Sequence, residues 1–367
     1  MEANSQKNIR SSNFELLRIV AMFMIVLHHC TVHGVFSYWH NNTTFIHHIN
    51  NFLCSFLASG GKIGVTIFVL ISGYFLCMQD FKISRLLKIY LNTLFYSIFF
   101  MLLSLLIGNH FVSSKMLRVS LMPFSCHAYW FMTAYLLLYM FSPLLNTILR
   151  NCEPKQIRIY LLLPAILWIF IPIIINTGLF YSILVYFFYL YLIGGAVRLG
   201  YINIKSKFLN LFALAAVVYL IINIILHEQH AVINLWKCFK YMELNTVYTL
   251  AVSLFIFNYF SKLNLKNNKF INYISASIFG VYLLHDNFFV RPYLWHKIFH
   301  VHTLMNDKFF CIEVMAISIL VFATCVIVDK IFSKLYTPII NKIINYIEPK
   351  KKLPLYNEEQ ILSNQKS

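Results

Sequence analysis

The stretch FELLRIVAMFMIVLHHC, residues 14–30, is apolar except for Glu15, Arg18 and two histidines near its end. His29 follows Arg18 by eleven positions, or about 1100° of helical rotation, roughly 20° more than three turns. We therefore expect both side chains on one helix face, about 16 Å apart along the axis. An ionisable residue inside a span costs about 2.5–3.5 kcal/mol, so it usually faces a cavity or partner and marks function.

The composition indicates an all-α integral membrane protein. Hydrophobic residues make up 59% of the 367 and charged residues only 12%, whereas a soluble domain is about 25% charged. The 30 Lys and Arg against 13 Asp and Glu are explained by short basic loops between spans. Since no soluble basic module is present, we expect no nucleic-acid binding. The eight cysteines form no CxxC pair, so we expect no metal site of that kind.

Ten apolar segments are long enough to predict transmembrane helices. The ninth is the weakest because it is short and contains His285 and Asp286. The predicted spans are 14–33, 53–77, 87–108, 128–148, 159–176, 179–198, 208–227, 241–260, 274–290 and 310–332.

The basic residues predict the orientation. With the N-terminus in the cytoplasm, 21 of the 30 Lys and Arg fall inside and eight outside, Lys62 being counted among the eight. His33 is one of many histidines assigned to the outside. We expect both termini in the cytoplasm, with a cytoplasmic segment at 1–13, a membrane domain at 14–335 and a cytoplasmic charged tail at 336–367. A multi-pass location in the inner or plasma membrane follows.

The first span suggests acid–base chemistry. Glu15 lies one turn before Arg18 and can pair with it, although such a pair could equally anchor the helix at the interface. A neutral His29 could take a proton from a hydroxyl and return it to a leaving group. The simpler alternative is a histidine that hydrogen-bonds a neighbouring helix. His28 points about 100° away and is expected to be structural.

Arg85 and Lys88 open the third span on one helix face. Positive charge at a helix start opposes the macrodipole, so the pair would suit a phosphate or pyrophosphate ligand. The positive-inside rule alone explains them equally well. Before them, GGKIGVTIFVLISGYFL, residues 60–76, is rich in small residues, which allow close helix packing or exposure of backbone to a ligand.

Several polar and aromatic residues at outer helix ends could bind an acceptor. Trp130 suits an interfacial aromatic belt or the stacking of a sugar ring. Together with His29, the others could line a polar outer cavity: Glu243, His285, Asp286 and Glu313. Asp286 or Glu313 could orient His29.

These elements together resemble the membrane acyltransferase-3 family over about residues 10–335. They are Arg18-x10-His29, FVLISGYFL, the basic start RLLKIY, YWFMTAYLLLYMFSPLLN and GVYLLHDN. The resemblance implies about ten helices, with the positions of Arg18 and His29 essential. It also implies a basic pair, here Arg85 and Lys88, that binds the donor, to which we add Ser72 and Tyr74 of the SGY sequence. A lysine at the second position lacks the bidentate geometry of arginine.

The resemblance further implies transfer of an acyl group, expected to be acetyl, from cytoplasmic acetyl-CoA to a hydroxyl of an envelope glycan or lipid-linked saccharide. We predict His29 as general base or transient acyl carrier, with Arg18 and the Glu15 that orients it as the other catalytic residues. One connected cavity should border Arg18, His29 and Arg85. Besides membrane lipids, partners could include other polysaccharide-synthesis proteins. The alternatives are a transporter of a lipid or anionic solute and a structural subunit of a polysaccharide machine.

Overall fold

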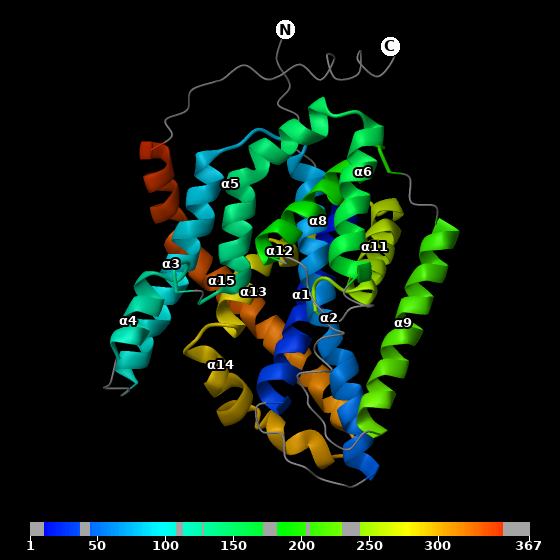
Figure 1. Ribbon diagram of the computed structural model, residues 1–367. Coiled ribbons are helices and arrows are strands. Elements are labelled where there is room, and N and C mark those ends of the chain that lie inside the picture. The colour runs from blue at the N-terminus through cyan, green and yellow to red at the C-terminus, as the bar shows by residue number, and fades with distance from the viewer. Residues whose placement is uncertain are drawn as a thin grey trace.

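The computed structural model describes residues 11–36, 45–107, 113–126, 128–171, 182–202, 206–229 and 243–347. These residues form helices joined by turns, with no strand among them. Figure 1 shows the helices arranged as a bundle around α1 and α2.

The elements of the first half are α1 (Ser12–His29), η1 (Cys30–Val35), α2 (Phe45–Leu76), α3 (Ile83–Leu106), α4 (Ser114–Leu121), α5 (Trp130–Asn151), α6 (Pro154–Ala165) and η3 (Ile166–Phe170). Those of the second half are α8 (Ile183–Arg198), α9 (Ser206–Gln229), α11 (Val247–Lys262), α12 (Lys269–Ser275), α13 (Ile278–His285), α14 (Val290–Pro292), η4 (Tyr293–Ile298), η5 (Val301–Asn306) and α15 (Phe310–Ile347).

In the described part of the chain, six helical segments are long and apolar enough to cross a membrane: Ser12–Val35, Phe45–Leu76, Ile83–Leu106, Trp130–Asn151, Lys207–Ile225 and Phe310–Ile347. Helix α8 is apolar but shorter, at 16 residues. The structure is thus an all-α, multi-pass membrane fold, while the number of ten spans remains a prediction.

The ninth predicted span, 274–290, is not one helix. Residues 269–285 form two short helices, α12 and α13, which meet at a turn around Ala276 and Ser277. The interruption leaves α13 only eight residues long and places His285 at its last position. At the other end of the chain, α15 continues without a break past residue 336 to Ile347, so the predicted start of the tail lies inside a helix.

Helix α2 packs against α1, α8 and α11, and glycine makes the close contacts possible. A Cβ atom on Gly64 would overlap the carbonyl oxygen of Ala21 in α1, and one on Gly73 would overlap that of Tyr191 in α8. Small residues let membrane helices approach this closely. Of the two explanations for the glycines of 60–76, close packing is the one that applies at Gly64 and Gly73.

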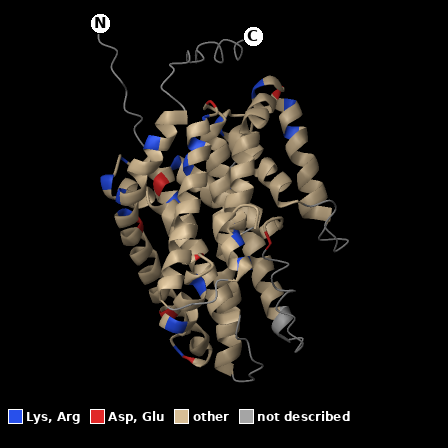
Figure 2. Ribbon diagram, turned by 90° about the vertical axis from the view of Figure 1, so that its left-hand side faces the viewer, with Lys and Arg blue, Asp and Glu red and all other residues tan. Residues whose placement is uncertain are grey.

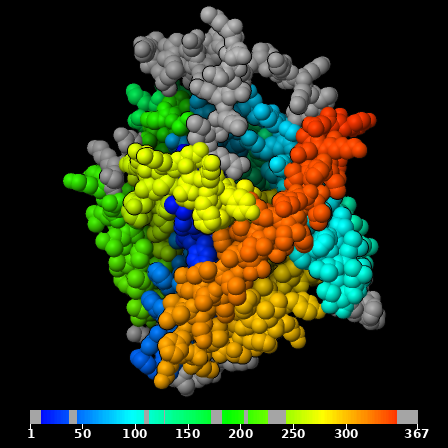
Figure 3. Space-filling view, turned by 180° about the vertical axis from the view of Figure 1, so that it is seen from behind, coloured from blue at the N-terminus to red at the C-terminus, as the bar shows by residue number. Residues whose placement is uncertain are grey.

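Two surface features bear on access to the centre. Figure 3 shows part of α1 in a hollow between α15 and the segment that precedes α13. In Figure 2, the Lys and Arg positions gather mainly toward the upper end of the bundle, with fewer in the rest of it.

Candidate active site

Helix α1 carries the two predicted residues in the expected register. It is α-helical from Ser12 to His29, so the rise between Arg18 and His29 is about 16 Å. Met22 and Ile25, on the stripe between them, are both buried, and so is His29. From Cys30 the chain continues as a π-helix, a geometry that occurs frequently at functional sites.

His29 forms a hydrogen bond with a second buried histidine. Its Nδ1 lies 2.9 Å from Nε2 of His285, at the end of α13. The Nδ1 of His285 in turn lies 2.6 Å from the carbonyl oxygen of Val281. Since a carbonyl only accepts, we assign the proton to Nδ1 of His285, whose Nε2 then accepts from Nδ1–H of His29. This tautomer leaves the Nε2 lone pair of His29 available as a base.

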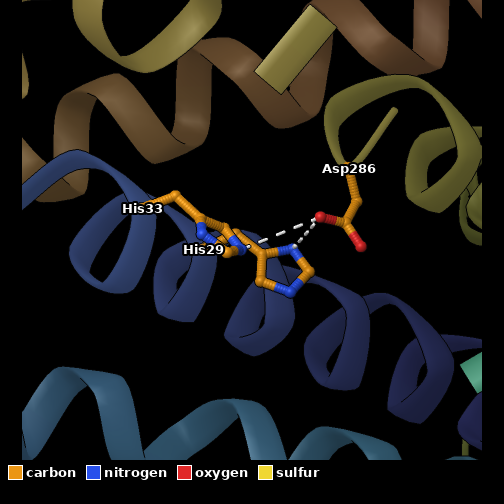
Figure 4. Close-up of side chains that lie close together, drawn as sticks. All are labelled: His29, His33 and Asp286. Atoms are coloured by element: carbon orange, nitrogen blue, oxygen red, sulfur yellow. Dashed lines mark ion pairs between the residues drawn. The ribbon is translucent and has the colours of Figure 1, made fainter. Parts of the chain in front are cut away.

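A carboxylate and a guanidinium flank the histidine pair. Oδ1 of Asp286 lies 3.8 Å from Nδ1 of His29 and 3.9 Å from Nε2 of His33, as Figure 4 shows. The guanidinium of Arg291 donates to the same oxygen at 3.2 Å and lies 3.5 Å from Nε2 of His33. The buried charge of Asp286 is therefore paired, as such charges require.

His29, His33 and Asp286 are also a donor set that a divalent metal could use, because their ligand atoms lie within 4.8 Å of one another. Arg291 already donates to the Asp286 oxygen that such an ion would need. A metal would therefore require the guanidinium to turn away, and in the geometry described here the cationic partner of Asp286 is Arg291.

The segment that follows α13 is held by Tyr129, immediately before α5. The buried hydroxyl of Tyr129 donates to the carbonyl of Leu283 at 3.2 Å and accepts from the amide of Asn287 at 2.6 Å. Tyr129 thus fixes the chain on both sides of His285 and Asp286.

His28 faces another direction, as the sequence predicted. Its Nδ1 forms a hydrogen bond with the carbonyl of Ala58 in α2, and its ring lies where a Cβ on Gly61 would be. These contacts make His28 part of the interface between α1 and α2.

Glu15 is bound from two sides. Its Oε1 accepts from Arg18 at 2.6 Å, and its Oε2 accepts from the hydroxyl of Ser275 at the end of α12. The pair therefore fixes the direction of the Arg18 guanidinium, which also lies 5.7 Å from the ring centroid of Phe75.

Four arginines surround the end of α2 and the turn after it, residues 74–79. In addition to Arg18 on Phe75, Arg198 donates to the hydroxyl of Tyr74 at 3.2 Å and Arg85 donates to Gln79 at 2.9 Å. Arg150 donates to the carbonyl of Cys77 at 2.7 Å. Cations at a helix C-terminus complement its dipole. We call Arg18, Arg85, Arg150 and Arg198 the arginine cluster.

The predicted donor residues divide between this cluster and its surroundings. Arg85 and Tyr74 belong to it, whereas Lys88 is exposed on α3. The hydroxyl of Ser72 donates to the Phe68 carbonyl at 2.8 Å and can accept from the Tyr135 hydroxyl at 3.1 Å, so it faces α5 rather than Tyr74.

The predicted acceptor residues divide as well. His285 and Asp286 join the His29 site. Trp130 instead faces Lys62, which lies within α2; its predicted place on the outer side stays a prediction. No hydrogen bond or ion pair among the described residues joins Glu313 to His29, and its Oε2 has no hydrogen-bond partner there. Glu243 is exposed just before α11.

Several residues of the site and its surroundings were missed, Arg150 of the arginine cluster among them. His33, assigned to the outside, comes four residues after His29 and lies on the helical continuation of α1; the i to i+4 spacing was the available signal. Arg291 comes five residues after Asp286, but a turn intervenes and no periodicity predicts their contact. Arg198 ends α8 and has no such signal either.

The cavity that we expected to connect Arg85 with His29 is not among the cavities described below and stays a prediction. Two cavities lie elsewhere. One, of about 260 Å³, has a mostly apolar lining from α3 and from the segment 289–293, including Phe100, Phe289 and Tyr293. The other, of about 400 Å³, lies between α9 and α11.

The fold is that of a multi-pass membrane protein, and two hydrogen-bonded histidines are buried inside it. The chain belongs to the acyltransferase-3 family: the family model described as an acyltransferase domain matches residues 11–329. Comparison with curated proteins gives no match, and neither does comparison with solved structures. The match covers both the His29 site and the arginine cluster, so the chain is a membrane acyltransferase.

Proposed function

We propose that this membrane acyltransferase moves an acetyl group from cytoplasmic acetyl-CoA to a hydroxyl of an envelope glycan or lipid-linked saccharide. The supporting observation is the hydrogen bond between His29 and His285, which leaves one nitrogen of His29 free as a base. The family assignment favours this function over a transporter or a structural subunit.

The reaction needs a base and then an acid. The acceptor oxygen attacks the thioester carbonyl while its proton passes to Nε2 of His29. The C–S bond then breaks, and the same proton passes to the coenzyme A thiolate. The imidazolium formed in between donates through Nδ1 to His285, with the Asp286 carboxylate 3.8 Å away to stabilise its charge. His29 as a transient acyl carrier uses the same lone pair.

The arginine cluster is the proposed donor site. Coenzyme A carries phosphates, and arginine binds phosphate in a planar, bidentate way. Glu15 and Ser275 hold Arg18 in place, and Arg85 and Arg198 contact the same end of α2. From there, an extended pantetheine arm would have to cover about the 16 Å rise to His29.

The orientation is part of the proposal. Both termini would be cytoplasmic, with the basic end of the bundle in Figure 2 on the inside. The arginine cluster would then face the cytoplasmic donor, and the His29 site would lie toward the outer half, where an envelope glycan is available. An inner or plasma membrane location follows.

The test is acyl transfer by the full chain in lipid nanodiscs. Acetyl-CoA labelled in the acetyl group is supplied with envelope glycan fractions, and label in the glycan is measured by mass spectrometry. We expect label that depends on His29. If no label is transferred from acetyl-CoA to any glycan or lipid-linked saccharide fraction, the proposed acceptor class is contradicted.

A further inference from the structure

Lys62 lies near the middle of the 32-residue helix α2, and it belongs to neither the His29 site nor the arginine cluster. An ammonium group at that depth is costly to insert and is found mainly where it faces a partner or a polar cavity. The side chain is partly buried, and its ammonium lies 5.0 Å from the ring centroid of Trp130.

The ammonium of Lys62 has no carboxylate within ion-pair distance in the described part of the chain. Glu243 acts on it only as a more distant negative charge. A cation–π contact uses the positive charge of the ammonium. It provides no hydrogen-bond acceptor for the three N–H donors of that group. The group is therefore prepared for an anionic oxygen supplied by a ligand.

The neighbours of both residues connect this position to the histidine pair. Gly61, next to Lys62, packs on the ring of His28, next to His29. Tyr129, next to Trp130, donates to the carbonyl of Leu283, two residues before His285. Lys62 and Trp130 are therefore each next in sequence to a residue that packs on the His29 site or its neighbour, so a molecule bound beside them would be close in the chain to the elements that position the base.

We propose that Lys62 and Trp130 form an acceptor subsite for an acidic saccharide, whose carboxylate or phosphate binds the ammonium and whose ring packs against the indole. This inference rests on the proposed function, because it specifies the charge of the glycan acceptor proposed there. Aromatic and basic groups side by side match the apolar face and the charge of such a sugar.

The experiment measures binding of three matched probes to the full chain in nanodiscs by saturation-transfer NMR: N-acetylglucosamine, N-acetylglucosamine 1-phosphate and glucuronic acid. We expect at least one anionic probe to bind about tenfold more tightly than the neutral sugar. Lys62→Gln should remove that preference, and Lys62→Arg should keep it. Lys334→Gln, which removes an exposed lysine of α15, is the matched control and should behave like wild type.

The two anionic probes identify the source of the charge. A preference for glucuronic acid alone assigns a sugar carboxylate, and one for the 1-phosphate alone assigns a phosphate. Equal binding of all three probes, no binding of any, or an unchanged preference in Lys62→Gln would overturn the subsite. Acetyl-CoA binding is measured in the same samples. Absence of acetyl-CoA binding would contradict the proposed donor while leaving a Lys62-dependent anion preference intact.

Discussion

Nδ1 of His29 and Nε2 of His285 lie 2.9 Å apart, although the two residues are 256 positions apart in the chain. His285 is in turn fixed by the carbonyl of Val281. The orientation of the proposed base therefore depends on a helix from the other end of the chain.

Replacing His285 should impair chemistry more than binding. In His285→Phe, Nδ1–H of His29 loses its acceptor, and the ring can adopt the wrong tautomer. We expect kcat to fall by about 10²–10⁴-fold, as when the residue that orients a catalytic histidine is lost, with acetyl-CoA affinity unchanged. His48→Ala, a histidine at the start of α2, is the control. Equal kcat values in the two variants would contradict the role of His285 in orienting His29.

His29→Ala should abolish acyl transfer, whereas His28→Ala should largely preserve it. Of the two, only His29 forms the hydrogen bond with His285, because His28 instead bonds the backbone carbonyl of Ala58. Transfer rates are compared at equal membrane abundance. Equal loss in both variants would rule out His29 as the specific base.

Arg291→Gln should slow the reaction by leaving the Asp286 carboxylate without its guanidinium. We expect roughly 10-fold or greater loss, because a buried charge without its partner costs several kcal/mol and the site must rearrange. Arg291→Lys keeps the charge and should lose less. The same samples are assayed with added Zn²⁺: if Arg291→Gln gains metal-dependent activity, the donor set of His29, His33 and Asp286 binds a cation in place of Arg291.

The donor site predicts different effects at two neighbouring basic residues. Arg85→Ala should weaken acetyl-CoA binding, since Arg85 belongs to the arginine cluster, and Lys88→Arg should weaken it less because charge and donors remain. Calorimetric titration with acetyl-CoA measures both. Unchanged affinity in Arg85→Ala would place the donor elsewhere.

Gly73→Ala should reduce the amount of folded protein, because the added methyl would overlap the backbone of Tyr191 in α8. We expect a loss of about 1–3 kcal/mol, the usual cost of overpacking. Gly60→Ala is the matched control, since its nearest neighbour, Met24, would be 3.4 Å from the new atom. Size-exclusion profiles and thermal unfolding of the two variants provide the comparison.

The sequence alone determined the class of the protein and the helix face that carries two of its site residues. Apolar segments fix where helices can cross a bilayer, since backbone polar groups must be satisfied within the segment. Helical periodicity likewise placed Arg18 and His29 on one face and His28 off it. These are local properties of the chain, which a pattern of residues expresses directly.

The partners of those residues were decided by the tertiary structure. The helical segment 269–285 is interrupted by a turn between α12 and α13. Ser275 and Tyr129 hold the ends of these two helices, which brings the residues around His285 to the residues of α1 and η1. The residues that meet are His285, Asp286 and Arg291 on one side and His29 and His33 on the other. The arginine cluster arises because α1, α3, α5 and α8 each bring one arginine to the end of α2 or the turn after it. Lys62 meets Trp130 through packing of the same kind. No local pattern records such contacts, since they depend on how helices distant in the chain pack together.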